Sequence, residues 1–458
     1  MLTRAADVAS LRSALGSQLI VADDPAWDAA RMPWNLACDQ HPLAVVRPRS
    51  AADVQAVVRA AAERGLQVAP QGSGHGAGPL GDLDGVILLR TTHLDSVSID
   101  PGARRARVGS GVLWRDVAVP AAAHGLAPLM GSSPDVGVVG YTLGGGMGWL
   151  ARRHGFAANA VEAVELVAAD GNLVRADAEH APDLFWALRG GGGSFGVVTT
   201  LEFALFPVAE VYAGSLFWPI ERAREVIVAW RDHLEALPRE VTSAIRLFQF
   251  PPLPQVPEPF RGRSFVALGA ACLLPSREAD ALLRPWRGLG PEIDTFTMMP
   301  ASGLGTVAMD PQEPVPAAGD GVLLRAVPDG AVDALLGEVG AGARSPLLVL
   351  ELRQLGGALA DSSPSHGVLD ALDAAVAVYG AGVVLDRESG AAVEDRLARV
   401  VRALGPWHAG RYFNFSERPS DGSDIFSAES YRRLQNVRRR YDPNAVFRAS
   451  HSIAIGDD

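Results

Sequence analysis

Apolar side chains in the first half of the chain recur alternately at helical and at strand spacing. Between residues 49 and 65, one helix face carries Val54, Val57, Val58 and Ala61, with Ser50 placed as the N-cap residue. Gly65 follows where such a helix would stop, so the pattern predicts a helix over this stretch. Short apolar runs at 66–70 and 85–89 predict strands, and a strand, a turn and a helix follow again over 106–126.

The pattern changes near residue 206 and changes again near residue 405. Long amphipathic stretches such as 221–237 alternate there with apolar strand-like runs such as 345–355. The proline-rich stretch 250–263 is typical of a stiff surface loop within this part. We therefore expect a second lobe over 206–405, distinct from a glycine-punctuated first lobe over 1–205.

Composition narrows the classes of protein that this chain can belong to. The mean hydropathy is +0.13, yet no apolar run approaches the roughly 18 residues of a membrane span, so the apolar residues are expected in the interior. A net charge of −11 argues against nucleic acid or an anionic membrane as the main partner, and the basic run 432–441 reads as a solvated helix face. The N-terminal residues lack a secretory pattern, and two cysteines offer no disulfide framework, so a cytoplasmic location is expected.

Several kinds of catalysis are excluded by missing residues. The chain has no lysine, which rules out a lysine Schiff base, and with it pyridoxal chemistry, and also the lysine of a phosphate-binding P-loop. The histidines show no paired spacing of the kind found in metal sites, and two cysteines cannot form a zinc ribbon. We therefore expect no metal centre.

Three glycine-rich segments are the strongest candidates for a binding site. They cover 70–80, 131–171 and 183–199. Glycines let backbone N–H groups approach an anionic ligand closely, which suits a dinucleotide pyrophosphate. The strict G-x-G-x-x-G fingerprint is absent, and plain tight turns remain the alternative reading of each segment.

Taken together, the motifs resemble a known family. "QGSGHG" at 71, the block 131–171, "DLFWALRGGGGSFGVVT" at 183, "ELRQLGGA" at 351, "YFNF" at 412 and the C-terminal stretch from Tyr431 occur in the family's order. The chain is similar to the berberine bridge enzyme-like FAD-linked oxidases of the vanillyl-alcohol oxidase superfamily, and in length to their short bacterial branch. The resemblance implies an α+β flavoprotein with two lobes, in which residues 406–458 return to the FAD-binding lobe. In the second lobe, an antiparallel sheet with helices on one face would cover the substrate site.

The resemblance also implies the cofactor contacts. His75 would be joined to the flavin, and Ser133 stands where doubly linked relatives have cysteine, so a single covalent link is implied. Gln71 replaces an arginine-like residue, and Tyr141 replaces a histidine that often faces the flavin pyrimidine. Small residues at Gly131 and Val136 would leave oxygen a path to the flavin. The implied cofactor-binding positions are Gln71, Gly72, Ser73, Gly74, His75, Gly76, Ser133, Val136, Gly137, Gly140, Tyr141, Gly144, Gly145, Gly148, Val198 and Asn414.

Two residue pairs are the candidates for acid–base chemistry. Glu351 and Arg353 lie two apart and would share a strand face, either as a structural ion pair or in contact with substrate. Tyr412 and Asn414 would be paired in the same way, either in contact with substrate and flavin or as an ordinary half-buried strand. In relatives that oxidise sugars a tyrosine in this motif is the base. The expected reaction is removal of hydride from an alcohol or amine carbon of a small organic substrate, with the flavin reoxidised by molecular oxygen. A dehydrogenase using another electron acceptor and a flavin-binding protein without turnover are the alternatives, and the sequence leaves the oligomeric state open.

Overall fold

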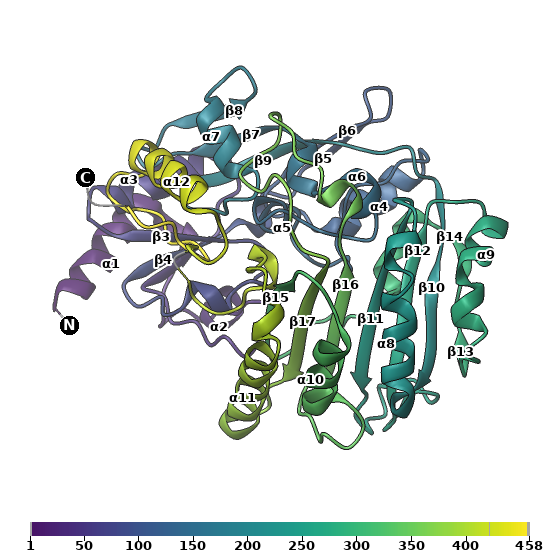
Figure 1. The fold of residues 1–458 in the computed structure, drawn as a ribbon. Helices are drawn as coiled ribbons and strands as arrows, with labels where there is room; N and C mark the ends of the chain where they lie inside the picture. Colours follow the sequence, from purple (N-terminus) through teal and green to yellow (C-terminus); the bar gives the residue numbers. More distant parts are fainter. Residues whose placement is uncertain (1, 421, 456–458) are drawn as a thin grey trace.

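A computed structural model describes residues 2–420 and 422–455, and its helices and strands form three sheets with helices packed around them (Figure 1). Residues 1 and 456–458, the outermost bounds of the predicted domains, lie outside the described residues. The mixed helix-and-sheet fold confirms the predicted class. The domain bounds themselves stay a prediction.

The first sheet is small and mostly parallel. Its strand order is β1-β2-β4-β3, in which β4 pairs parallel with both β2 and β3. The carboxyl ends of β3 and β4 therefore meet at one edge, where ligands of parallel sheets usually bind. The strands are β1 (Leu19–Ile20), β2 (Ala44–Val46), β3 (Gln67–Gln71) and β4 (Val86–Arg90), and the helices around them are α1 (Leu2–Leu15), α2 (Trp27–Arg31) and α3 (Ala51–Ala62).

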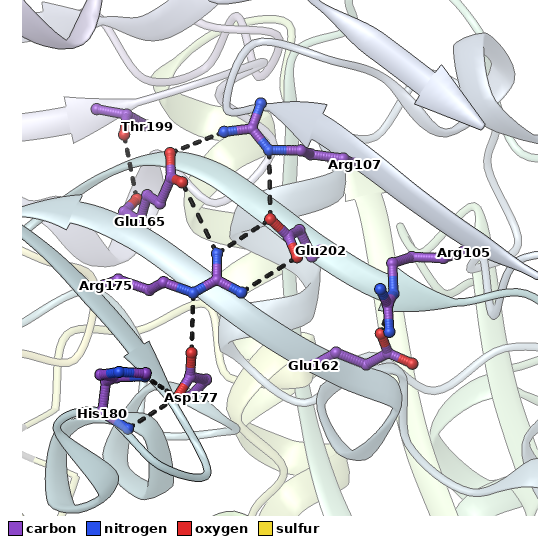
Figure 2. A network of polar contacts seen from close by, with 9 residues as sticks. All are labelled: Arg105, Arg107, Glu162, Glu165, Arg175, Asp177, His180, Thr199 and Glu202. Carbon is purple, nitrogen blue, oxygen red and sulfur yellow. Dashed lines mark hydrogen bonds and ion pairs between the residues drawn. The ribbon is translucent and has the colours of Figure 1, made fainter. Parts of the chain in front are cut away.

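The second sheet is antiparallel, with the order β5-β6-β9-β7-β8. Figure 2 shows that one face of it carries a network of arginines and carboxylates, including Arg175 with Glu202 at 3.1 Å and Asp177 at 2.8 Å. The other face packs into an apolar cluster. The elements are β5 (Val97–Asp100), β6 (Arg105–Gly109), β7 (Val161–Val167), β8 (Leu173–Asp177), β9 (Val197–Ala204), α4 (Trp114–Ala122), α5 (Val138–Leu143), α6 (Ala151–His154) and α7 (Pro182–Leu188).

The third sheet is antiparallel throughout and forms the second lobe. Its order is β13-β10-β12-β11-β16-β17-β15, and β14 also pairs with β10. Four helices cover one face, where apolar residues of helices and strands form one large core (Figure 1). The elements are β10 (Glu210–Pro219), β11 (Val241–Gln249), β12 (Ser264–Cys272), β13 (Ile293–Asp294), β14 (Thr297–Pro300), β15 (Ala317–Leu324), β16 (Val349–Gln354), β17 (Val376–Val383), α8 (Ala223–Arg231), α9 (Ser276–Arg287), α10 (Asp329–Val339) and α11 (Arg387–Ala403).

Strand alternation gives the two faces of this sheet different chemistry. Trp218 points into the core beneath the helices, whereas its neighbour Phe217 belongs to a separate phenylalanine cluster with Phe248. Phe296 contacts Tyr212 at the β10 edge, with ring centroids 5.6 Å apart. These aromatic residues all pack against other side chains.

The C-terminal segment packs on the first half of the chain. Helix α12 (Ala428–Tyr441) contributes Leu434 and Val437 to the core of the second sheet. The Val68 N–H of β3 donates to the Val446 carbonyl, and the Arg448 N–H donates back to the Val68 carbonyl. The first lobe is thus assembled from both ends of the chain.

Several local predictions are tested directly. The helix predicted at 49–65 is α3, where Ser50 accepts the Asp53 N–H and Gly65 adopts a φ of +62°. The strand predicted at 412–415 is wrong, because Phe413–Phe415 form a 3-10 turn in which the Phe415 N–H bonds the Tyr412 carbonyl. The basic run is helical as expected, but Arg438 is buried and bonds the Phe447 carbonyl, so this face is only partly solvated.

Candidate active site

The loop that carries His75 leaves the carboxyl end of β3 and turns sharply. Gly74 has a φ of +90°, and a Cβ there would lie 2.6 Å from the Pro33 side chain. Both the backbone angle and the close approach require glycine at this position. The loop thereby brings His75 against the segment that contains Trp34.

Three neighbours hold the His75 ring. It stacks on Trp34 with ring centroids 4.0 Å apart and an interplanar angle of 18°. Its Nδ1 lies 2.9 Å from Ser73 Oγ, and its Nε2 lies 3.7 Å from Asp135 Oδ2. The Trp34 indole N–H also donates to Asp135, at 2.6 Å, so the ring has one defined orientation.

Buried polar atoms without partners collect around this loop. The side-chain nitrogen of Gln71, Nε2 of His75 and the hydroxyl of Ser110 have no hydrogen-bond partner, although Gln71 accepts from Arg90 through its oxygen at 2.8 Å. The Tyr141 hydroxyl, beside Gly131 and Gly146, also has none. A Cβ on Gly140 would meet nothing within 4 Å. Buried polar groups in native proteins are normally bonded, so these atoms fit a polar ligand such as FAD.

One segment connects the His75 loop to the second candidate centre. Gly137 donates its N–H to Ser73 Oγ at 3.2 Å, and the helix α5 that follows it spans about 9 Å. Beyond the helix, a Cβ on Gly144 would lie 1.9 Å from Asn414 Oδ1, and one on Gly145 would lie 3.4 Å from the Tyr412 hydroxyl. The glycines therefore let the chain lie directly against the "YFNF" segment.

Hydrogen-bond donors converge on the Tyr412 hydroxyl. The Asn414 amide lies 3.4 Å from it, and the backbone N–H groups of Gly146 and Met147 also donate toward it. Burial raises the pKa of Tyr412 above its ordinary value of 10, while the charge of Arg353 and these donors act in the opposite direction. Asn414 also donates to the Tyr141 carbonyl at 2.9 Å, which fixes the 3-10 turn against the glycine segment.

Glu351 and Arg353 share one face of β16, as the sequence predicts, and they form an ion pair. Arg353 Nε donates to Glu351 at 2.6 Å and its Nη1 donates to the Met147 carbonyl at 2.8 Å. Arg246 of β11 binds the other carboxylate oxygen, with Nε at 2.6 Å. Burial opposes ionisation, but the two arginines prevail and lower the pKa of Glu351 to about 2. A carboxylate held in this way is a poor proton acceptor, so the geometry favours a supporting role.

The remaining predicted residues either form hydrogen bonds or only pack against their neighbours. Ser133 donates to Asp135 beside His75, Val136 accepts the Trp114 N–H, and Gly76 accepts the Ser450 hydroxyl. Gly72 packs on the Ser110 carbonyl, Gly148 lies against Met130, and Val198 sits in the apolar core of the second sheet. Their roles toward a cofactor stay predictions.

Sequence reasoning missed three residues of the site. Asp135 stands inside the glycine-rich segment 131–171, where an acidic residue directly after Pro134 was the available signal. Trp34 and Arg246 come from segments without a glycine pattern, and only the fold brings them to His75 and Glu351.

The fold and these loops define an FAD-binding flavoprotein with a second, sheet-based lobe. Residues 42–177 match the family described as FAD binding domain, and residues 411–454 match berberine and berberine like. These two matches, with the relatives and the solved structures below, support the assignment of the chain to the berberine bridge enzyme-like family of FAD-linked oxidoreductases.

Similar proteins include oxidases of different substrates. (R)-6-hydroxynicotine oxidase of Paenarthrobacter nicotinovorans is 36% identical over 44% of this chain and 44% of its own length. Glucooligosaccharide oxidase of Sarocladium strictum is 32% identical over 49% of this chain and 46% of its own length. The alignments thus span less than half of these relatives.

Solved structures match over nearly the whole chain. The structure of 6-hydroxy-D-nicotine oxidase from Arthrobacter nicotinovorans covers 97% of this chain and 98% of its own, with 25% identity and a TM-score of 0.81. BBE-like 1 of Physcomitrella patens covers 99% of this chain and 100% of its own, with a TM-score of 0.85, and at 20% identity it supports the fold alone. Within residues 2–420 and 422–455, no helix is both long and apolar enough to cross a membrane.

Proposed function

We propose that the chain is an FAD-dependent oxidase that removes hydride from an alcohol or amine carbon of a small organic molecule. The observation that carries this proposal is the Tyr412 hydroxyl, which is buried yet surrounded by three donors and the charge of Arg353. Oxidation of a hydroxyl or protonated amine needs a group that takes its proton. Burial raises the pKa of Tyr412, and the three donors with Arg353 are the groups that act against burial in favour of the phenolate.

FAD fits the loops of the first lobe. The partnerless polar atoms near Gln71 and His75 and the open space beside Gly140 are the features that a bound dinucleotide would satisfy. When bound, FAD supplies the two-electron acceptor of the reaction. In this proposal His75 carries the single covalent link, because Ser133 has no thiol.

The side chains and backbone groups of the site then have separate roles in the proposed reaction. Tyr412 accepts the substrate proton, and Asn414 with the Gly146 and Met147 N–H groups holds the phenolate oxygen. Arg353 stabilises the phenolate charge, and Glu351 with Arg246 fixes Arg353 on the sheet face. A cytoplasmic location remains part of the proposal.

Anaerobic mixing with alcohols, sugars and cyclic amines tests the function. We expect one class to bleach the flavin absorbance, and air to restore the colour within seconds with formation of hydrogen peroxide. Recovery that needs an added dye would point instead to a dehydrogenase, and absence of bleaching across all classes would favour a flavin-binding protein without turnover.

Tyr412→Phe tests the proposed base. The flavin-reduction rate should fall by about 10²–10⁴ with the fold and FAD content intact, because general-base assistance is lost. The wild-type rate should rise with pH through one ionisation that the variant lacks. The control is Tyr212→Phe, which removes a hydroxyl on β10 bonded to Asp280 at 2.6 Å and should leave the rate unchanged. Equal rates in wild type and Tyr412→Phe would remove Tyr412 from the mechanism.

A further inference from the structure

The hydrogen bonds around His75 select one protonation form of its ring. Ser73 Oγ accepts the Gly137 N–H, which leaves its own hydrogen free to donate to Nδ1 of His75. The carboxylate of Asp135, which can only accept, faces Nε2 at 3.7 Å. The form with the ring proton on Nε2 turns its N–H toward the Asp135 carboxylate and lets Nδ1 accept from Ser73, so the carboxylate favours this form through its charge, without a direct hydrogen bond.

Asp135 is arranged to remain a carboxylate. It is buried with an exposed fraction of 4%, and the Ser133 hydroxyl and the Trp34 N–H both donate to it. Burial by itself would raise the pKa of Asp135, but the interactions with His75, Ser133 and Trp34 outweigh burial and lower it. Since the Trp34 ring also stacks on His75, the aspartate and the imidazole are held by a common neighbour.

We propose that Asp135 is the positioning residue for covalent attachment of FAD, acting through His75: it holds the proton on Nε2 so that Nδ1 presents the lone pair that forms the new bond. This inference rests on the covalent link of the proposed function. The arrangement is that of a carboxylate that orients a histidine and stabilises the positive charge the ring gains when its other nitrogen reacts.

The attachment balances with dioxygen as the oxidant. The Ser73 hydroxyl first releases Nδ1, and a bond then forms between Nδ1 and the 8α carbon of the flavin, while one C–H bond of the 8α methyl group and the N–H bond at Nε2 break. The Nε2 proton is lost to solvent, and the Asp135 carboxylate stabilises the positive charge of the ring until that proton leaves. The two electrons of the broken C–H bond go to dioxygen, which leaves as hydrogen peroxide with two protons.

The test measures attachment itself. Full-length protein from riboflavin-starved cells is mixed with FAD in air, and acid-stable flavin is followed over time, with reversible FAD binding measured in parallel. Asp135→Asn keeps the shape and removes the charge, and it should slow attachment about 10²-fold or more while FAD still binds. Asp135→Glu keeps the charge and should recover part of the rate. The control Asp170→Asn makes the same change at an exposed turn, where Asp170 accepts from the Asn172 amide at 2.7 Å, and should leave the rate of attachment unchanged.

The outcomes distinguish a failure of this inference from a failure of the proposed function. The rate order wild type, Asp135→Glu, Asp135→Asn supports a role for the charge. Attachment in Asp135→Asn that is as fast as wild type, or faster than in Asp135→Glu, overturns it, because a merely structural role would be met better by the isosteric asparagine. Wild-type protein that releases all its FAD in acid overturns both the covalent link and the role of Asp135, and leaves the oxidase reaction standing.

Discussion

Replacing Glu351 by glutamine would leave two buried guanidinium groups side by side without their carboxylate. Glu351 is 4% exposed, and both Arg246 and Arg353 bind it. The Met147 and Ala308 carbonyls that also accept from these arginines carry only partial charge. The variant therefore places like charges close together in the interior of the second lobe.

Two arguments give the size of the expected loss in the free energy of unfolding. The lowering of the Glu351 pKa from its ordinary 4.5 to about 2 corresponds to about 3 kcal/mol of folding free energy. Removal of one partner from a buried ion pair costs about 3–5 kcal/mol in other proteins. We therefore expect Glu351→Gln to lower the free energy of unfolding by about 3 kcal/mol at pH 7.

Urea unfolding of both proteins across pH measures the loss. Because the folded-state pKa is depressed, the contribution of Glu351 is fully present above the ordinary pKa and disappears as pH falls toward about 2. The gap between wild type and variant should therefore be constant above about pH 5.5 and shrink below it. The control is Glu225→Gln, which breaks an exposed pair with Arg222 at 2.8 Å and should cost less than about 1 kcal/mol. Equal losses in the two variants, or a gap that ignores acid, would refute the reasoning.

Three further outcomes are expected. Gly144→Ala should displace Asn414 and weaken FAD binding in a titration, since a Cβ there would lie 1.9 Å from the Asn414 amide oxygen. Gly140→Ala, where a Cβ meets nothing within 4 Å, should keep the melting temperature of the apoprotein measured by calorimetry. Arg175→Ala, in the exposed network of Figure 2, should change the free energy of unfolding by less than about 1 kcal/mol, and the change should diminish in 1 M salt. Val136→Ile should slow reoxidation by air without changing anaerobic reduction, followed by stopped-flow absorbance.

Local periodicity is sufficient to predict an element of secondary structure where residues close in sequence determine it. Ser50, Val54 and Gly65 define α3 by capping, an apolar face and a left-handed stop, and all three signals are local. Glu351 and Arg353 were placed on one face because strand alternation is equally local. Where several signals of this kind agree, the sequence predicts the element.

The remaining parts of the site depend on contacts between distant segments. Tyr412 and Asn414 come together in a 3-10 turn and not on a strand, because Asn414 is bonded to the Tyr141 carbonyl far along the chain. The pairing of His75 with Trp34 and Asp135 likewise joins three separate loops. The periodicity of one segment does not predict contacts between distant segments, so only the folded structure reveals these contacts.

The return of the C-terminal segment to β3 has a consequence for the order of events during synthesis. Gln67, four residues before the loop of His75, donates its side-chain amide to the Ala445 carbonyl, 378 positions later in the chain. The ribosome must therefore release almost the entire polypeptide before this edge of the sheet is complete. The second lobe, whose strands all lie between these two points, can fold first as a unit. We expect nascent chains stalled before residue 440 to hold a folded second lobe and no flavin.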